Sequence, residues 1–330
     1  MKCAVLGAGA WGAALADRLA RNAHDVRLWA YEPDVAESIN STHRNRFLAD
    51  VELASSIAAY TEMKDVVSGA EFVVLVAPSH VTRSVAEAAQ PYLSRDAIVV
   101  VASKGIEQHS LSRMTQIADE VFGRAGAVAL SGPTFAAEVA RGQPTAIVAA
   151  SAAREAAERV QQLFHGPAFR VYTQHDVVGV ELGGAVKNVM AVATGIAEGL
   201  ELGFNARAAL ITRGLAEMTR LGVALGADPA TFAGLAGMGD LVLTCTGQLS
   251  RNRALGVEIG RGKTLDEALA GRETVAEGVI TTRSARELAE RVGVNMPIVD
   301  AAFSVLFDGQ TPRDAIVDLM NRDPRPERDE

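Results

Sequence analysis

The stretch CAVLGAGAWG, residues 3–12, decides the fold expected for this chain. It begins as an apolar strand and ends as the pattern GxGxxG at the start of a helix-like segment. In that setting the glycines let the backbone turn tightly and approach a pyrophosphate at the positive end of the helix. A tight turn without a ligand is the alternative, because the pattern alone is weak. We expect a dinucleotide cofactor to contact Gly7, Gly9, Ala10, Trp11 and Gly12.

The hydrophobic pattern of the sequence changes part-way along the chain. In the first half, short apolar runs alternate with amphipathic segments, which predicts a parallel sheet covered by helices on both faces. From about Asp176, long helical patterns rich in Ala, Leu and Gly follow without a convincing strand. The expected fold class is α/β, with an N-terminal doubly wound, Rossmann-like parallel sheet over residues 1–175 and an all-α domain over residues 176–330. The predicted strands lie at 3–7, 25–31, 71–78, 97–103, 127–133 and 145–151.

Composition and charge argue against several classes of function. The formal net charge is −8 and no basic stripe is visible, which argues against nucleic-acid binding. The two cysteines are too few for a disulfide framework, and the six histidines show no metal-ligand spacing, so no metal site is expected. The segment after Met1 lacks the apolar core and cleavage site of a signal peptide, which favours a cytoplasmic protein.

The segment Gly260–Thr264 ends like a phosphate-binding P-loop. The complete pattern requires glycine at position 257, where this chain has Val257, and it should follow a strand. A helical pattern precedes the segment instead. We therefore expect an exposed loop between two helices.

The stretch GVELGGAVKNVMAVATGIAEG, residues 179–199, places a lysine among apolar and small residues. A membrane span needs roughly 20 apolar residues, and this run is shorter and is interrupted by Lys187 and Asn188, so no span is expected. A lysine whose stem packs on the surface is the ordinary alternative. Its neighbours at helical spacing include Gly183 and Gly184, which make no polar face for it. A buried lysine must have a partner or a function.

Seven motifs in order give the chain a specific resemblance. They are GAGAWG, LVAPSH, SKGIE, LSGPTFAAEVARG, ELGGAVKN, LAGMGDLVLTCTGQLSRNRALG and ETVAEGV, and they span nearly the whole sequence. With them the chain resembles the bacterial-type NAD(P)-dependent glycerol-3-phosphate dehydrogenases. The resemblance implies reversible hydride transfer between the nicotinamide of NAD or NADP and C2 of a three-carbon phosphate. The substrates would be dihydroxyacetone phosphate and sn-glycerol 3-phosphate, the latter supplied to phospholipid synthesis.

The resemblance also implies that Lys187 is the catalytic proton donor and acceptor. When hydride reaches a carbonyl carbon, negative charge builds on the oxygen, and an ammonium group stabilises and protonates it. Lys104 of SKGIE would be a second cation nearby, and both it and burial would lower the pKa of Lys187. Asp240 resembles a carboxylate that contacts the substrate and orients the lysine. Outside this family, an aspartate in such a glycine-rich turn would be read as a helix N-cap.

The remaining implied contacts divide between substrate and cofactor. Arg251 offers a planar fork suited to phosphate, and Ser250 and Asn252 add short polar groups at a helix start. The implied substrate contacts are Lys104, Gly132, Thr134, Lys187, Asp240, Ser250, Arg251 and Asn252. The implied cofactor contacts outside the glycine turn are Tyr31, Glu32, Lys104, Ala136, Arg251, Val275 and Glu277. For the last two, a loop residue and a surface acid are the ordinary alternatives.

The end of the second predicted strand bears on the choice between NAD and NADP. An acid there selects the ribose of NAD, whereas an arginine accommodates the 2′-phosphate of NADP. Many members of the family carry a basic residue where this chain has Tyr31, and Glu32 follows it. Two observations oppose an NAD preference: the segment 43–46 could bring an arginine over the phosphate, and Glu32 could be a solvated acid at a helix start. We predict that NADH is preferred over NADPH about tenfold in kcat/KM, equivalent to roughly 1.4 kcal/mol.

Two other functions fit part of the pattern. A dehydrogenase acting on a 3-hydroxy acid or a ketopantoate-like substrate would share the architecture but would need a site for the substrate carboxylate. A dinucleotide-sensing module without catalysis would keep GAGAWG but would not need Lys187 on a buried helix. A homodimer is the expectation from the frequency of twofold assemblies.

Overall fold

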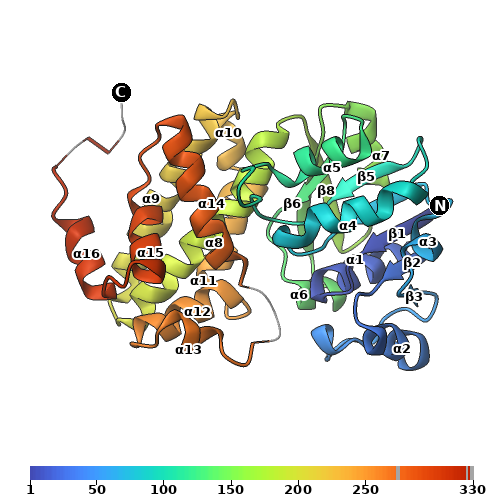
Figure 1. The fold of residues 1–330 in the computed structure, drawn as a ribbon, viewed down its shortest axis with the longest axis horizontal. Coiled ribbons are helices and arrows are strands. Elements are labelled where there is room, and N and C mark those ends of the chain that lie inside the picture. Colours follow the sequence, from blue (N-terminus) through green and yellow to red (C-terminus); the bar gives the residue numbers. More distant parts are fainter. Residues whose placement is uncertain (273–275, 325, 328–330) are drawn as a thin grey trace.

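An eight-stranded sheet forms one half of the molecule (Figure 1). The computed structural model describes residues 1–272, 276–324 and 326–327. The strand order is β3-β2-β1-β4-β5-β6-β7-β8, and every neighbouring pair is parallel except β6 and β7. The strands are β1 (Lys2–Leu6), β2 (Asp25–Trp29), β3 (Ala58–Tyr60), β4 (Phe72–Leu75), β5 (Ile98–Val101), β6 (Val128–Ser131), β7 (Thr145–Ala150) and β8 (Phe169–Gln174).

Helices cover both faces of this sheet. Along β1 the side chains alternate: Cys3 and Val5 pack toward one face, and Ala4 and Leu6 pack toward the other. The first face is covered by α1 (Ala10–Arg21), α2 (Pro33–Thr42), α6 (Ala136–Ala140) and α7 (Arg154–Phe164). The second is covered by α3 (Met63–Val67), α4 (Thr82–Ala89) and α5 (Met114–Phe122). Burial on both faces explains why the central strands are continuous apolar runs.

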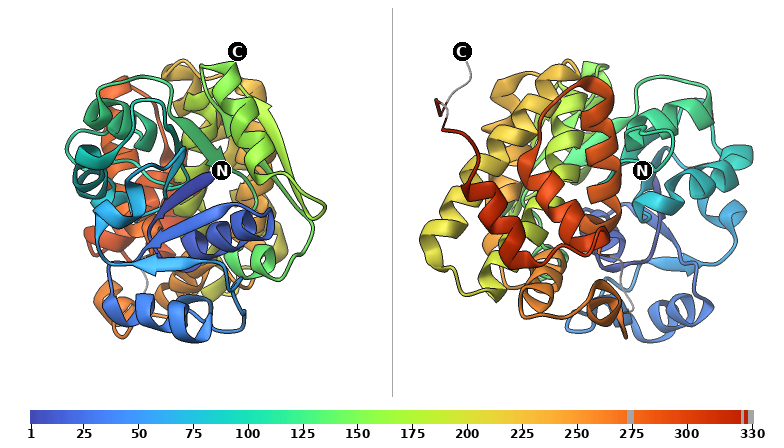
Figure 2. Two further views of the ribbon diagram at one scale, coloured as in Figure 1. Left: turned by 90° about the vertical axis from the view of Figure 1, so that its right-hand side faces the viewer. Right: turned by 60° about the vertical axis from the view of Figure 1, so that its left-hand side comes forward.

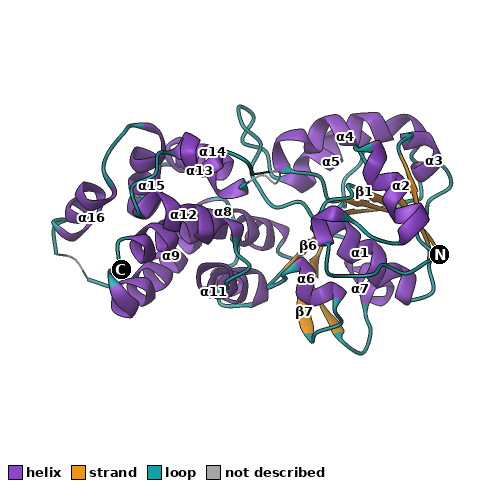
Figure 3. Ribbon diagram, turned by 90° about the horizontal axis from the view of Figure 1, so that it is seen from below, coloured by secondary structure: helices purple, strands orange, loops and turns teal. Residues whose placement is uncertain are grey.

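The other half of the molecule is helical in the part that is described (Figures 2 and 3). Its helices are α8 (Val177–Gly199), α9 (Gly203–Ala224), α10 (Pro229–Phe232), α11 (Asp240–Thr246), α12 (Arg251–Gly260), α13 (Leu265–Leu269), α14 (Glu277–Val292), α15 (Pro297–Phe307) and α16 (Pro312–Met320). A π-helical turn, η4, spans Leu235–Gly239 in this half, whereas short 3₁₀ turns lie in the sheet half at Arg46–Leu48, Ser79–Val81 and Gln90–Tyr92. The predicted α/β fold with an all-α C-terminal domain is confirmed.

Helix α8 runs through the centre of the helical half. It is long and apolar enough to cross a membrane, but 83% of its apolar window is buried inside the protein. It packs against α9, α11, α12 and α14. Its hydrophobic composition is therefore that of a core helix.

Glycines let α8 and α12 approach backbone to backbone. A Cβ atom at Gly195 would overlap the carbonyl oxygen of Arg253, and one at Gly256 would overlap that of Val192. The two helices run in the same direction, because Gly199 lies against Gly260 one turn further along both. The amino end of α12 is consequently held beside the middle of α8.

Three features of the sheet differ from the expectation. The strands β3 and β8 were not predicted, because β3 has three residues and β8 alternates buried and exposed side chains instead of forming a continuous apolar run. The pairing of β6 with β7 is antiparallel, where a parallel sheet was expected. Apolar composition indicates burial of a strand but does not encode its direction.

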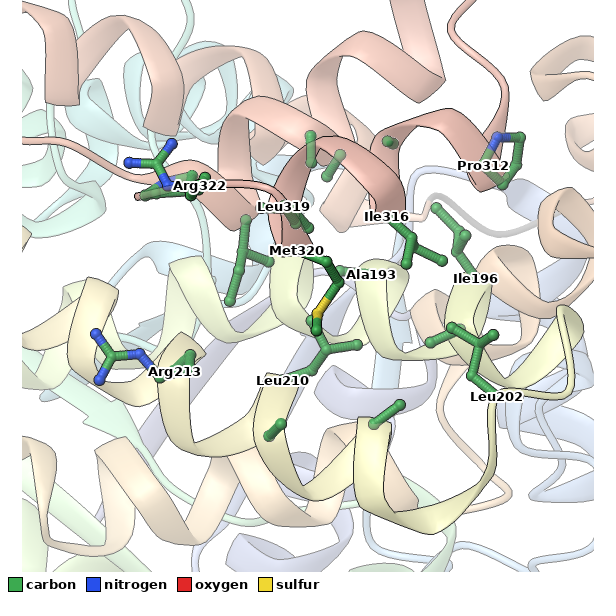
Figure 4. Close-up of a pocket in the computed structure, with 18 of the residues that line it drawn as sticks. Ala193, Ile196, Leu202, Leu210, Arg213, Pro312, Ile316, Leu319, Met320 and Arg322 are labelled. Carbon is green, nitrogen blue, oxygen red and sulfur yellow. The ribbon is translucent and has the colours of Figure 1, made fainter. Parts of the chain in front are cut away.

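An apolar cavity of about 810 Å³ lies beneath α16 (Figure 4), at the end of the helical half that is away from the sheet in Figure 1. It is bounded by α8, α9, α15 and α16 and is partly open to solvent, and Leu210, Ile316 and Met320 point into it. Arg213 and Arg322 lie along one side of it in Figure 4. None of the predicted site residues that the structure describes lines this cavity.

Candidate active site

The loops that follow β1, β4, β5 and β6 form one edge of the sheet. These strands are mutually parallel, so their carboxyl ends lie side by side. In doubly wound folds this is the edge where ligands bind. The loops contain Gly7, Ser79, Lys104 and Gly132, and contacts from several of them reach the helical half.

The loop after β1 has the geometry of a dinucleotide-binding turn. Gly7 has a φ of +128°, and a Cβ atom at Gly12 would overlap the carbonyl oxygen of Gly7. A Cβ atom at Gly9, by contrast, would meet nothing within 4 Å, so space is open at the amino end of α1. Among the described residues, the buried indole N–H of Trp11 has no hydrogen-bond partner. These features fit a pyrophosphate on the helix terminus.

Lys187 and Lys104 meet on one carboxylate. The Lys187 ammonium donates to Oδ1 of Asp240 and, at 2.9 Å, to the hydroxyl of Thr244. The Lys104 ammonium donates to Oδ2 of Asp240 at 2.6 Å and to the carbonyl oxygen of Gly132 at 3.0 Å. Lys187 and Asp240 are 6% and 1% exposed, so this cluster is shielded from bulk water.

The pKa of Lys187 is lowered from its usual value to about 8. Burial is the largest cause, and the nearby charge of Lys104 lowers the pKa further. The Asp240 carboxylate acts in the opposite direction by stabilising the ammonium form. A lysine with this pKa can give and take a proton near neutral pH.

Two adjacent glycines on α8 bring the other elements close to this cluster. A Cβ atom at Gly183 would overlap the carbonyl oxygen of Ala236 in the π-helical turn η4, which leads directly into Asp240. A Cβ atom at Gly184 would lie 2.5 Å from Oγ of Ser131, at the end of β6. The two glycines of the motif ELGGAVKN thus allow η4 and the end of β6 to pack directly against the helix that carries Lys187.

The loop after β6 holds Gly132 and Thr134 beside the two lysines. Gly132 has a φ of +155°, and its carbonyl oxygen accepts hydrogen bonds from Lys104 and, at 3.2 Å, from the Thr134 hydroxyl. Ala136 is the first residue of α6, which follows this loop. The predicted contacts of these three residues with substrate or cofactor stay predictions.

The segment 250–252 begins α12, as predicted. Ser250 is its N-cap and accepts from the Arg253 amide, while the Asn252 side chain donates to Asn188 at 2.9 Å and accepts from the Gly278 amide. These two side chains thus hold the helix start in place. Within the described residues the Arg251 guanidinium makes no hydrogen bond or ion pair, and burial lowers its pKa while the charge of Glu277 raises it. It is the free cation at the amino end of α12 within that part of the chain.

Glu277 connects the two halves of the molecule. Its carboxylate accepts from the Ser79 amide at 3.1 Å and from the Ser79 hydroxyl at 2.5 Å. Burial raises the pKa of Glu277, and the two bonds from Ser79 oppose the rise. Glu277 is therefore not a solvated surface acid. Val275, the other predicted contact in this segment, lies outside the described residues.

The predicted ribose end of the site lies between β2 and α2. Tyr31 is 78% exposed, and Glu32 directly precedes α2. Arg46, which could have covered a 2′-phosphate, is ion-paired with Asp34 at the start of α2. The P-loop-like segment, in contrast, is a loop between α12 and α13, as expected. Among the described residues, no group of His, Cys, Asp or Glu is placed to hold a metal ion.

Comparison with known proteins shows to which family the chain belongs. Residues 2–157 match the N-terminal family described as NAD-dependent glycerol-3-phosphate dehydrogenase N-terminus, and residues 176–317 match the corresponding C-terminus family. The chain belongs to the NAD-dependent glycerol-3-phosphate dehydrogenase family. The resemblance drawn from the seven motifs is confirmed, and with it the assignment to NAD(P)-dependent oxidoreductases.

Relatives support this membership over the whole length. The glycerol-3-phosphate dehydrogenase [NAD(P)+] of Geobacter metallireducens is 54% identical over 331 residues, which cover 99% of each chain. The crystal structure of glycerol-3-phosphate dehydrogenase from Coxiella burnetii has a TM-score of 0.93 at 38% identity and covers 97% of this chain and 98% of that one. A ketopantoate reductase structure from Ralstonia eutropha is 18% identical with a TM-score of 0.64, covering 96% of this chain and all of that one, which shows a shared fold alone.

Sequence reasoning missed two side chains that contact the site, Thr244 and Ser79, and a third, Glu181, that lies on the same helix as Lys187. Thr244 lies one helical turn after Asp240, and that spacing could have identified it. Ser79 lies in the motif LVAPSH, but its partner Glu277 is 198 positions away. Glu181 lies in the same apolar stretch as Lys187 and was overlooked there.

Proposed function

We propose that this chain reduces the C2 carbonyl of dihydroxyacetone phosphate to sn-glycerol 3-phosphate, with Lys187 as the proton donor, and catalyses the reverse reaction with Lys187 as the acceptor. The observation that carries the proposal is the buried cluster in which Lys187 and Lys104 share the Asp240 carboxylate. The bound cofactor supplies or accepts the hydride. The product is a precursor for phospholipid synthesis.

The roles of the chain's own groups follow from their charges. As negative charge develops on the carbonyl oxygen, the Lys187 ammonium stabilises it and transfers its proton. Asp240 holds Lys187 and Lys104 in place, and the Thr244 hydroxyl accepts from the same ammonium and donates to the backbone oxygen of Asp240 at 2.6 Å. These bonds fix the direction in which the proton leaves Lys187.

The substrate phosphate would bind at the amino end of α12. Arg251 supplies a guanidinium there, and the helix terminus adds a partial positive charge. The backbone packing of α12 on α8 supports this placement, because Asn252, which follows Arg251, donates a hydrogen bond to Asn188, which follows Lys187. Phosphate at Arg251 and the carbonyl at Lys187 would orient a three-carbon substrate across the site.

The same proposal divides the chain between residues 175 and 176 into a dinucleotide-binding and a catalytic domain. The division is supported by the end of β8 at Gln174 and the start of α8 at Val177. The glycine turn, Tyr31, Glu32, Ala136 and Glu277 would contact the cofactor. The reaction would take place in the cytoplasm.

A homodimer would cover the exposed apolar surface beside the cavity. Phe204 and Met320 are 82% and 79% exposed, Leu202 and Met320 line the cavity, and Phe204 lies two residues after Leu202. A protruding aromatic next to an open cavity suits a twofold interface, which must be complementary to itself. Light scattering during size-exclusion chromatography should give twice the chain mass, and Phe204→Glu should give a monomer. A monomeric wild type would overturn the dimer.

The proposed reaction is tested by NADH oxidation with dihydroxyacetone phosphate. We expect turnover with this substrate and little with a ketopantoate-like acid or a 3-oxo acid. Turnover on the acids alone would favour the other dehydrogenases of this fold. Cofactor binding without turnover on any substrate would favour a sensing module.

A further inference from the structure

Glu181 lies on α8, six residues before Lys187, and is buried. Its carboxylate accepts three hydrogen bonds: from the Thr115 amide at 2.7 Å, the Thr115 hydroxyl at 2.6 Å and the Arg113 guanidinium at 2.6 Å. Both partners lie at the amino end of α5, in the sheet half. A single side chain of α8 thus holds, by hydrogen bonds, the start of α5, which packs on the sheet.

The loop that leads into the start of α5 is the one that carries Lys104. After β5 the chain passes through Lys104, and Ile106 then forms a β-bridge with Arg113. The Glu107 amide donates to the Ser112 oxygen at 3.0 Å, which closes the loop between them. The position of Arg113 therefore constrains that of Ile106, which is two residues from Lys104.

A second contact of α8 acts on the same segment. A Cβ atom at Gly184 would lie 3.6 Å from Cγ and Cδ of Lys104, so the lysine stem runs directly over the helix. Helix α8 therefore carries Lys187, supports the stem of Lys104 at Gly184 and holds the far end of its loop through Glu181. The positions of the two ammonium groups are set by one rigid element.

We propose that Glu181 is a positioning residue that fixes the separation of the Lys104 and Lys187 ammonium groups across Asp240 and thereby sets the protonation state of Lys187 during turnover. The proposal rests on the proton-transfer role assigned to Lys187. Glu181 itself touches neither of the two lysines in the described structure.

The charges around each group give the direction of the effect. The charged groups that act on Lys187 are Asp240 and Lys104, and the charge that acts on Glu181 is that of Arg113. The thiol of Cys245 also lies near this cluster, and burial raises its pKa while the charge of Lys187 opposes part of that rise. If the loop loosens and the Lys104 ammonium moves away from Asp240, Lys187 loses a nearby positive charge. Asp240 then pairs with Lys187 and no longer with Lys104. The pKa of Lys187 should then rise above its wild-type value.

Three variants separate positioning from simple stabilisation. Glu181→Gln removes the charge that pairs with Arg113. Thr115→Val removes the hydroxyl that donates to Glu181 and accepts a long, 3.5 Å bond from Arg113, while keeping the backbone contact with Glu181. The control is Glu217→Gln, which alters another buried carboxylate on α9 that accepts backbone bonds from Ile298 and Val299. Glu217 caps α15 and has no contact with the lysine cluster in the described structure.

The first readout is the pH profile of dihydroxyacetone phosphate reduction. In Glu181→Gln the alkaline limb should move up by about half a pH unit or more, with a smaller move in Thr115→Val. Glu217→Gln should leave the limb at its wild-type position although it lowers the melting temperature. If the Glu181 and Thr115 variants lower the melting temperature but leave the alkaline limb at its wild-type position, the proposal is overturned.

The second readout does not depend on activity. The rate at which acetic anhydride acetylates Lys187, followed against pH by peptide mass spectrometry, reports its pKa directly. An upward shift in Glu181→Gln supports the inference, and an unchanged acetylation profile overturns it. If acetylation shifts but the pH–rate profile does not follow, Lys187 is not the proton donor, and the role assigned to it fails while the structural effect of Glu181 stands.

Discussion

Lys104 and Lys187, which come from opposite halves of the molecule, donate hydrogen bonds to the two oxygens of the same buried carboxylate. Two ammonium groups on one carboxylate leave a net positive charge in a site shielded from water. Such a site favours the negative charge that develops on a carbonyl oxygen as hydride arrives.

Lys187→Ala should abolish turnover while leaving cofactor binding largely intact. Loss of a positioned general acid costs ~10²- to 10⁴-fold in rate. The rate is measured by NADH oxidation and cofactor binding by quenching of protein fluorescence. A variant that keeps more than about a tenth of the wild-type kcat would show that the proton comes from another group.

The rate should depend on pH in opposite ways in the two directions. Reduction needs the ammonium form of Lys187, whose pKa is lowered to about 8, so its rate should be constant below that pH and fall above it. Oxidation of sn-glycerol 3-phosphate needs the free amine and should rise over the same interval. Initial rates between about pH 7 and 10, above the second ionisation of a phosphate monoester near 6, isolate this group. A reduction rate that does not fall would contradict the assignment.

Arg251→Ala should mainly impair use of the phosphorylated substrate. A hydrogen bond to a charged group contributes about 1.5–3 kcal/mol, so kcat/KM should fall roughly ten- to a hundredfold or more. Dihydroxyacetone without the phosphate should be affected much less. Arg253→Ala is the control, because that arginine lies on the same helix but pairs with Glu198. Equal losses on both substrates would assign Arg251 to the cofactor or the fold.

The cofactor preference is tested at Glu32. We expect NADH to be favoured over NADPH about tenfold in kcat/KM, because a 2′-phosphate would meet a carboxylate and because Arg46 is already paired with Asp34. Glu32→Ala should raise kcat/KM for NADPH, and Asp34→Ala, which releases Arg46, should raise it further. A wild type that prefers NADPH, or a Glu32→Ala variant with no gain, would contradict the prediction.

Gly256→Ala tests the backbone contact between α8 and α12. A Cβ atom there would overlap the carbonyl oxygen of Val192, so the helices must separate. Strain of this kind costs about 1–3 kcal/mol of unfolding free energy, and kcat/KM should also fall because Arg251 moves with α12. Urea unfolding and steady-state kinetics measure the two effects. Unchanged stability would mean that the contact is looser than the structure indicates.

The sequence predicted the elements that carry their own signal. A glycine-rich turn after an apolar strand and a lysine in an apolar helix are visible within a dozen residues, and both lie where expected in the structure. The bonds that assemble the site join distant residues: Lys104 to Asp240 across 136 positions, and Ser79 to Glu277 across 198. The family resemblance placed Lys104 and Asp240 each near Lys187, but the bond between Lys104 and Asp240 was not predicted.

Some features were missed although a local signal was present. Glu181 is a charged residue in the same apolar stretch as Lys187, and the argument that a buried charge needs a partner applies to it equally. The π-helical turn before Asp240 has no comparable signal, because its Gly-rich sequence also suits an ordinary loop. The edge strand β8 also carries a local signal, because its side chains alternate between buried and exposed, but only continuous apolar runs were interpreted as strands.

The close contact of α8 and α12 has a consequence for how this enzyme can diverge. The spacing of the two helices is set by main-chain atoms at Gly195, Gly199, Gly256 and Gly260, so it does not depend on the size of any side chain. Substitutions elsewhere in the helical core can accumulate without changing the distance from Lys187 to the start of α12. Neutral drift can therefore remodel the outer helices and the cavity beneath α16 while the distance between the proposed proton donor and the proposed phosphate site stays the same.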